Sequence, residues 1–249
     1  MKGRFKIVIP SFNSINYLPK TLASVESQIN KNYEVCVIDD CSSFPKQREI
    51  ILEYCQRNQW KYVFHEKNLG ALASIVEAIH GFNCKDEDVI VMLDGDDWLY
   101  DPYVLTKLDK IYTEEDVYLT WGQFETYPPH CIHMNYATWI PDEVIDRKLY
   151  REIIDIFGHL KTYKYRLFRE IKDLDLRDPD TQEYFRVSWD KALMYPMLEM
   201  AGHKVRFVPD LLYVYNIDNP LSDYKVNRPE QIIATDYIRS KPHYKTLKL

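Results

Sequence analysis

The chain is best understood from ten residues near its middle, Val89-Ile90-Val91-Met92-Leu93-Asp94-Gly95-Asp96-Asp97-Trp98. Five consecutive apolar residues predict a buried strand, since the run is too short for a membrane span. Three carboxylates follow at once, so they lie where the strand leaves its sheet, and in open α/β sheets ligands bind at that edge. Carboxylates this close repel one another, and a divalent cation with a phosphate-bearing ligand would relieve the repulsion. The alternative is a solvated acidic turn.

The composition indicates one large domain, alone or with an appendage. The chain has 249 residues, of which 46% are hydrophobic, and this is enough to bury a substantial core. The formal net charge is −6, so there is no overall basic field that would favour nucleic acid as the main partner. The 20 tyrosines suit contacts with sugars or bases as well as packing in the core.

The five cysteines favour neither disulfides nor a zinc site, because they form no Cys-x-x-Cys pair and their number is odd. The N-terminal residues lead straight into a predicted strand, without the apolar region of a signal peptide. No run reaches the roughly 18 apolar residues that a spanning helix needs. We therefore expect a soluble cytoplasmic protein without a transmembrane segment.

The first hundred residues alternate strands with helices. Strands are predicted over 5–10, 33–38, 60–65 and 89–93, and helices over 17–28, 45–58 and 71–82. This order implies a parallel sheet with right-handed crossovers. Two of the strands end in adjacent acids on the same edge, one of them at Asp39 and Asp40. Neither a Gly-x-Gly-x-x-Gly loop nor a P-loop occurs, which argues against a dinucleotide enzyme and a P-loop ATPase.

The remaining residues show weaker patterns. Helices are predicted over 103–112, 163–171 and 189–200, and strands over 117–121, 203–208 and 211–215. Residues 123–148 have little periodicity and many rings and prolines, so they are either functional or a surface excursion. The tail from residue 228 is polar and locally basic. A frayed or packed tail is favoured, and a peripheral contact with a membrane surface or a partner stays open.

Five short motifs in order make the pattern recognisable. They are Ile7-Val8-Ile9-Pro10-Ser11-Phe12-Asn13, Val37-Ile38-Asp39-Asp40-Cys41-Ser42, Asn68-Leu69-Gly70, Leu93-Asp94-Gly95-Asp96-Asp97-Trp98 and Trp189-Asp190-Lys191-Ala192-Leu193. With them the chain resembles the inverting glycosyltransferases of family 2, over about residues 5 to 220. The resemblance implies the GT-A fold, a single α/β domain with a Rossmann-like, mixed and mostly parallel sheet flanked by helices. It divides the chain into a nucleotide-sugar-binding half (1–100), an acceptor-binding and catalytic half (101–220) and a C-terminal extension (221–249).

The resemblance also implies a donor site. Asp40, with Asp39 beside it, corresponds to the acid that hydrogen-bonds the imide N–H of the base, which favours uracil or thymine. The turn around Asn68 corresponds to the part that closes over the nucleotide and sugar. The implied nucleotide-sugar contacts are Pro10, Ser11, Phe12, Asn13, Asp39, Asp40, Asn68, Gly70, Asp94, Gly95, Asp96, His159 and Lys161. The last two would steady the diphosphate charge, although a lone histidine or lysine is more often solvated or capping.

The Asp-x-Asp motif of the family implies a divalent metal, Mn²⁺ or Mg²⁺, that bridges the diphosphate. Asp96 and Asp97 match this motif, and we expect Asp97 to be the direct ligand and Asp94 to orient the others. Many relatives carry a histidine near the metal after the late tyrosine strand, where this chain continues to Asp218. We expect Asp218 to replace that histidine as an oxygen ligand, unless water does so.

Asp190 matches the acid that serves the family as catalytic base at the start of a helix. The residue before it is Trp189 instead of Glu or Asp, which removes a helper carboxylate but leaves the base. The alternative role for Asp190 is a plain helix cap, which acids also favour.

Together these expectations describe an enzyme that moves one sugar from a nucleotide-diphosphate donor, with a UDP-sugar favoured, to a hydroxyl of a glycan or glycoconjugate. A growing glycan or a glycoprotein is the favoured acceptor, and a lipid-linked acceptor stays open. The rings from Phe124 to Trp139 suit stacking on acceptor sugars. A sugar nucleotidyltransferase is one alternative, but it usually opens with a glycine-rich basic loop that residues 10–13 lack. A non-catalytic nucleotide-sugar or glycan-binding protein is another, and the intact acids argue against it.

Overall fold

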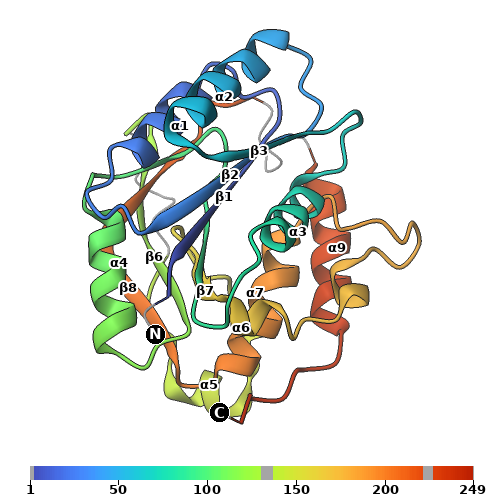
Figure 1. Cartoon of the computed structure of the whole chain (residues 1–249). Coiled ribbons are helices and arrows are strands. Elements are labelled where there is room, and N and C mark those ends of the chain that lie inside the picture. Colours follow the sequence, from blue (N-terminus) through green and yellow to red (C-terminus); the bar gives the residue numbers. More distant parts are fainter. Residues whose placement is uncertain (1–2, 130–136, 221–226, 249) are drawn as a thin grey trace.

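The computed structural model describes residues 3–129, 137–220 and 227–248 (Figure 1). Its first elements are β1 (Phe5–Ser11), α1 (Leu18–Glu26), β2 (Tyr33–Asp39), α2 (Pro45–Asn58), β3 (Lys61–Phe64), α3 (Ala71–Gly81), β4 (Val89–Met92) and β5 (Trp98–Leu99). They are followed by α4 (Val104–Glu114), β6 (Leu119–Tyr127), α5 (Asp142–Arg147), η2 (Leu149–Arg151), β7 (Thr162–Lys164), α6 (Tyr165–Phe168), η3 (Asp173–Leu176), α7 (Trp189–Ala201), β8 (Val205–Asn216) and α9 (Arg228–Ser240). No helix within the described ranges combines the length and the hydrophobicity needed to cross a membrane.

Within the described residues, eight strands from both halves of the chain form one sheet, in the order β3-β2-β1-β4-β7-β6-β8-β5. Strand β1 pairs in parallel with β2 on one side and β4 on the other, so that Phe5 lies opposite both Tyr33 and Val89. Strand β7 is antiparallel to β4 and β6, and β8 is parallel to β6. The predicted α/β class, with a mixed and mostly parallel sheet flanked by helices, is confirmed.

Each face of the sheet carries its own hydrophobic core, which explains why β4 is apolar at every position. Val89 and Val91 join the core under α1, α2 and α4, whereas Ile90 and Met92 join the core under α3 and α7. Figure 1 shows the first group of helices on one side of the sheet and α3, α7 and α9 on the other. Because both faces are covered, the polar residues that follow β4 can reach solvent only at the edge of the sheet.

The second half departs from the sequence-based expectation at several places. Thr162–Lys164 is a strand, because it pairs with both β4 and β6, and only the following four residues form the expected helix. The two strands expected over 203–208 and 211–215 are one strand, β8, which pairs with β6 across register shifts. Strand β6 continues to Tyr127, and α5 forms later in the stretch where no periodicity was visible.

A buried ion pair fastens the C-terminal helix to the domain. Arg151 Nε lies 2.5 Å from Glu199 Oε1 on α7, and the two side chains are 3% and 0% exposed. The same guanidinium donates to Ile238 O at 2.8 Å and to Lys241 O at 3.0 Å, at the end of α9. Glu199 Oε2 also accepts from Tyr244 N at 2.8 Å. The tail was expected to be either frayed or packed, and its described residues 228–240 form a helix packed on the domain.

Candidate active site

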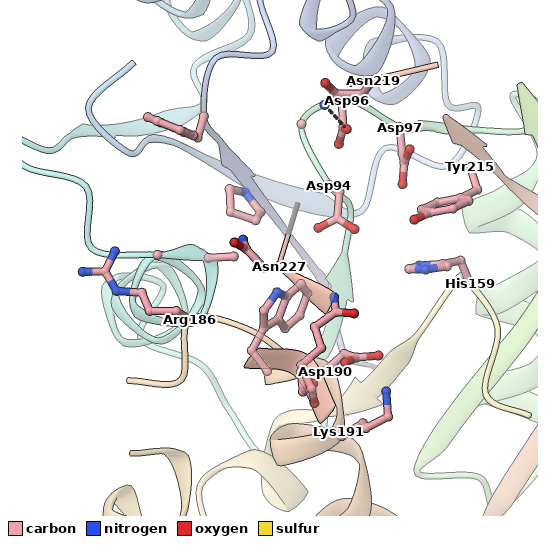
Figure 2. A pocket seen from close by; sticks show the side chains of 18 of the residues that line it. Asp94, Asp96, Asp97, His159, Arg186, Asp190, Lys191, Tyr215, Asn219 and Asn227 are labelled. Atoms are coloured by element: carbon pink, nitrogen blue, oxygen red, sulfur yellow. Dashed lines mark hydrogen bonds between the residues drawn. The ribbon is translucent and has the colours of Figure 1, made fainter. Parts of the chain in front are cut away.

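One large cleft, with a volume of about 940 Å³, opens at the carboxyl edge of the parallel strands. Its walls come from the ends of β1 and β4, the loop before β7, the first turn of α7 and one face of α9. Figure 2 shows Asp94, Asp96 and Asp97 on one side of the cleft, with Asp190 and Lys191 on the other. A cleft of this size suits a small molecule the size of a cofactor.

Gly95 brings the acidic turn against the end of β1. Its N–H donates to Pro10 O at 3.0 Å, and a Cβ on Gly95 would lie 2.8 Å from both Pro10 O and Ser11 Cβ. Pro10, Ser11 and Phe12 line the cleft, as does Gly95 itself. Asn13 is not among the lining residues: its backbone is left-handed, with a φ of 50°, and its Oδ1 accepts from the backbone of the β2–α2 loop at 2.8 Å. Asn13 therefore shapes this wall from behind.

Asp40 organises the turn that precedes α3. Its Oδ1 accepts from Leu69 N and its Oδ2 from Gly70 N, both at 2.7 Å. Gly70 has a φ of 90°, and a Cβ on it would lie 3.0 Å from Arg186 Cδ. Asp40, Asn68 and Gly70 all line the cleft. The carboxylate thus holds in place the very turn that was expected to close over the nucleotide.

Two residues next to Asp40, His65 and Asp39, do not line the cleft themselves. His65 Nδ1 lies 2.7 Å from Asp40 Oδ1, and His65 Nε2 lies 2.9 Å from Glu77 Oε2. Burial lowers the pKa of His65, but hydrogen bonds to these two carboxylates outweigh burial and raise it above its ordinary value. Asp39 is fully buried, and two side chains of α2 donate to it at 2.9 Å. The structure therefore places Asp39 behind the cleft, because neighbouring strand residues point to opposite faces.

The three carboxylates after β4 have different surroundings. Asp97 is 1% exposed, and its oxygens accept from Tyr213 Oη at 2.6 Å and from Asn216 N at 2.7 Å. Asp94 and Asp96 are half-buried, and all three carboxylates line the cleft. Burial raises the pKa of Asp96, and burial with the charges of Asp96 and Asp94 raises the pKa of Asp97. The crowding of negative charge inferred from the sequence is present in the fold.

Asp218 does not join these carboxylates. It is exposed, its carboxylate accepts from Tyr17 Oη at 3.2 Å, and it is not among the residues that line the cleft. Asn219 Nδ2 donates instead to Asp96 Oδ2 at 2.7 Å (Figure 2). Within the described part of the chain, no three His, Cys, Asp or Glu side chains form a group that could hold a metal. The expected set of Asp96, Asp97 and Asp218 is therefore not assembled, because the chain after β8 turns Asn219 toward the cleft.

Asp190 lies in the first turn of α7 and has a lysine partner. Lys161 Nζ is 3.1 Å from Asp190 Oδ2, and the side chains are 5% and 27% exposed. Burial would raise the pKa of Asp190, but the charges of Lys161 and Lys191 outweigh burial and hold it well below its ordinary value. Lys191 Nζ also lies 3.3 Å from Asp155 Oδ2. The N-cap of α7 is Ser188, so Asp190 is not the cap. It is an ionised carboxylate that faces the cleft.

His159 lines the cleft as part of an aromatic stack. Its ring lies 4.7 Å from that of Tyr213 and 5.4 Å from that of Tyr215, measured between centroids. Burial and then the charge of Lys161 lower the pKa of His159. A neutral imidazole offers a hydrogen bond instead of a positive charge, and Lys161 shares its charge with Asp190. Of the two residues expected to steady a diphosphate by charge, His159 is therefore a neutral ring in the aromatic stack, and Lys161 is the ion-pair partner of Asp190.

The aromatic stretch expected to hold the acceptor packs mainly elsewhere. Among its described residues, Phe124 alone lines the cleft. Tyr127 packs edge-on against a ring of β5, and Trp139 against a ring of β8. Residues 130–136 of the stretch lie outside the described part of the chain.

Several residues that line the cleft were not predicted from the sequence as ligand contacts. Those that matter below are Trp189, Asn219, Gln231, Thr235, Asp236 and Arg239. Four of the six come from α9, whose polar residues recur at helical spacing, and this spacing is the one signal that could have indicated them.

Comparison with known protein sequences points to one family. The family model described as "Glycosyl transferase family 2" matches residues 6–172. The glycosyltransferase GlyA of Streptococcus pneumoniae is 27% identical over 184 residues, which are 68% of this chain and 25% of GlyA. GlyG of the same organism is 22% identical over 228 residues, which are 86% of this chain and 71% of GlyG. This chain therefore corresponds to a small part of one relative and to most of the other.

Solved structures share the fold at low sequence identity. S. aureus TarS 1–349 has a TM-score of 0.66 at 17% identity, over 95% of this chain and 64% of TarS 1–349. The same fragment in complex with UDP-GlcNAc has a TM-score of 0.56 at 16% identity, over 86% of this chain and 58% of that one. Mannosyltransferase PcManGT from Pyrobaculum calidifontis, in complex with GDP-Man and Mn²⁺, has a TM-score of 0.64 at 13% identity, over 98% and 66%. These likenesses confirm the expected GT-A fold. The chain spans less than two thirds of the length of the TarS fragment.

Proposed function

Since the chain belongs to glycosyl transferase family 2 and is a glycosyltransferase, we propose that it transfers one sugar from a nucleoside diphosphate donor to a hydroxyl of a glycan or glycoprotein, with inversion at the anomeric carbon. A UDP-sugar is the favoured donor, and Mn²⁺ or Mg²⁺ assists. Two neighbours support a nucleotide-sugar donor, because TarS was solved with UDP-GlcNAc and PcManGT with GDP-Man. A cytoplasmic location stays a prediction.

The opposed carboxylates of the cleft support this proposal most directly. The crowded acids after β4 lie across from Asp190 at the head of α7 (Figure 2). The acidic side suits a diphosphate with its cation, and the ionised Asp190 suits an acceptor hydroxyl. An acceptor that enters from the side of Asp190 attacks the anomeric carbon opposite the departing diphosphate, which is the geometry of inversion.

The acids after β4 suit a divalent cation. Such ions prefer oxygen ligands and are commonly bound by one or two carboxylates together with substrate phosphates. We assign this role to Asp96 and Asp94, which are half-buried at the cleft, in place of Asp97, whose oxygens already accept from Tyr213 and Asn216. When bound, the cation supplies positive charge that stabilises the departing diphosphate.

Asp190 receives the proton in the proposed reaction. The acceptor O–H gives its proton to the Asp190 carboxylate as the acceptor oxygen bonds to the anomeric carbon. The bond from that carbon to the diphosphate oxygen breaks, and the nucleoside diphosphate leaves with the electron pair. Lys161 holds Asp190 ionised and in place at 3.1 Å. A positioned base of this kind contributes about 10²–10⁴-fold to the rate.

Thermal unfolding with UDP, GDP, CDP and dTDP, each with and without Mn²⁺, tests the donor site. A ligand at about 100 times its Kd adds about 2.7 kcal/mol to the free energy of unfolding. We expect this stabilisation from UDP with Mn²⁺ and its loss in Asp96→Asn. Asp180→Asn is the matched control, because Asp180 is an exposed turn residue outside the cleft. If no nucleotide stabilises the protein with or without Mn²⁺, the donor site is wrongly assigned.

Asp190→Asn tests the base separately from donor binding. With the sugar nucleotide whose diphosphate stabilises the protein best, we expect release of the nucleoside diphosphate to slow by about 10²–10⁴-fold. The stabilisation by UDP with Mn²⁺ should remain, since Asp190 lies across the cleft from the acids after β4. A variant with a near-normal rate would show that another group is the base.

A further inference from the structure

Helix α9 presents one polar face to the cleft. Arg228, Gln231, Thr235 and Arg239 follow one another at spacings of three and four residues, so they lie on one side of the helix. All four line the cleft, and Asp236 lines it beside them. A segment expected to be an extension of the domain therefore supplies a wall of its candidate active site.

Ser188 holds this face in register with the helix that carries Asp190. Its hydroxyl lies 3.0 Å from Gln231 O and 2.9 Å from Thr235 Oγ1. Ser188 is the N-cap of α7 and directly precedes Trp189 and Asp190. The polar face of α9 is therefore fixed beside the proposed base, and the Arg151 contacts described above hold the far end of the helix.

Trp189 adds a large apolar surface to the same wall. Its side chain is half-buried and packs against the core under α3 and α7, yet it also lines the cleft. It occupies the position before Asp190, so it is anchored in the first turn of α7. A rigid ring packed on one side and open on the other suits a flat ligand.

We propose that Trp189 and the polar face of α9 form the acceptor-binding site, and that the acceptor group bound there is a carbohydrate ring. This inference rests on the proposed function, in which Asp190 takes a proton from the acceptor. A sugar ring has an apolar C–H face that packs on the indole, and hydroxyls that pair with the polar groups of Gln231, Asp236 and Arg239. The acids after β4 lie across the cleft and are assigned to the donor, so this wall is left for the acceptor.

Saturation-transfer NMR on the full chain with UDP and Mn²⁺ tests the proposal. The probes are methyl β-glucoside, lactose, maltose and chitobiose, with glycerol as a polyol that has no ring. We expect at least one of the four sugars to bind through its C–H face and glycerol to give no signal. The affinity of the sugar that binds should fall about tenfold or more in Trp189→Ala and in Gln231→Ala. The fall should be smaller in Trp189→Phe, which keeps a ring. Ile233→Ala is the control, because Ile233 is 72% exposed on α9 and outside the cleft lining.

The outcomes separate this inference from the proposed function. If the wild type binds UDP with Mn²⁺ but none of the four sugars, the carbohydrate site is refuted while the donor site stands. Sugar binding that is unchanged in both alanine variants would place the acceptor elsewhere. If Trp189→Ala fails to fold, Gln231→Ala and Asp236→Ala carry the same test. A wild type that does not bind UDP refutes the donor site itself.

Discussion

Removal of Arg151 should destabilise the protein far more than removal of an exposed arginine. Its guanidinium makes two hydrogen bonds to Glu199, at 2.5 and 3.0 Å, and two to backbone carbonyls at the end of α9. Arg151→Met keeps much of the side-chain volume but leaves the fully buried Glu199 carboxylate without its counter-charge. Breaking a buried pair in this way costs about 3–5 kcal/mol. Because each kcal/mol lowers the Tm of a domain of this size by about 2–4 °C, we expect a fall of about 6–20 °C.

Urea and thermal unfolding, followed by circular dichroism, measure this loss against a matched control. Arg147→Met removes an arginine whose pair with Glu143 is 64% and 70% exposed, and should cost only about 0.3–0.5 kcal/mol. The double variant Arg151→Met/Glu199→Met should recover most of the loss, because apolar replacement of a whole buried pair is often neutral. A loss in Arg151→Met no larger than that of the control would refute the reasoning that this pair is desolvated and fastens α9.

Three further changes, the last of them with a control variant, test other contacts. The protonated His65 should stabilise the fold fully below its unfolded pKa of about 6.5, and this stabilisation should disappear as the pH rises through the raised folded pKa. The difference in unfolding free energy between wild type and His65→Gln should therefore shrink from pH 6 to 8.5. Lys161→Met removes a charge that lowers the pKa of Asp190, so the low-pH loss of kcat/KM should move to higher pH; an unmoved profile would contradict the pairing. Gly95→Ala should cost about 1–3 kcal/mol in thermal unfolding, because its Cβ would meet backbone at 2.8 Å. Gly81→Ala, where nothing lies within 4 Å, should be neutral or stabilising.

The helices and strands of the first half can be predicted from the sequence because their hydrophobic patterns are local. The apolar run of β4 and the helical spacing of Leu72, Ile75 and Ile79 in α3 each reflect burial that neighbouring residues reveal. Strand β7 has no such signal, because its three residues become a strand only by pairing with β4 and β6. The same holds for α9, whose packing depends on Arg151, far away in the sequence.

For the active site, the sequence alone determined which motifs gather at the carboxyl edge of the sheet, because the order of strands and helices sends the end of each parallel strand to that edge. Only the tertiary structure decided which side chains reach the cleft. It decides which of the alternating residues Asp39 and Asp40 faces the cleft, and it places Asn219 on Asp96 while Asp218 stays outside. The physical reason is that such orientations depend on partners distant along the chain. Asp97 accepts from Asn216, 119 residues away, and α9 forms one wall of the cleft because Thr235 contacts the N-cap of α7.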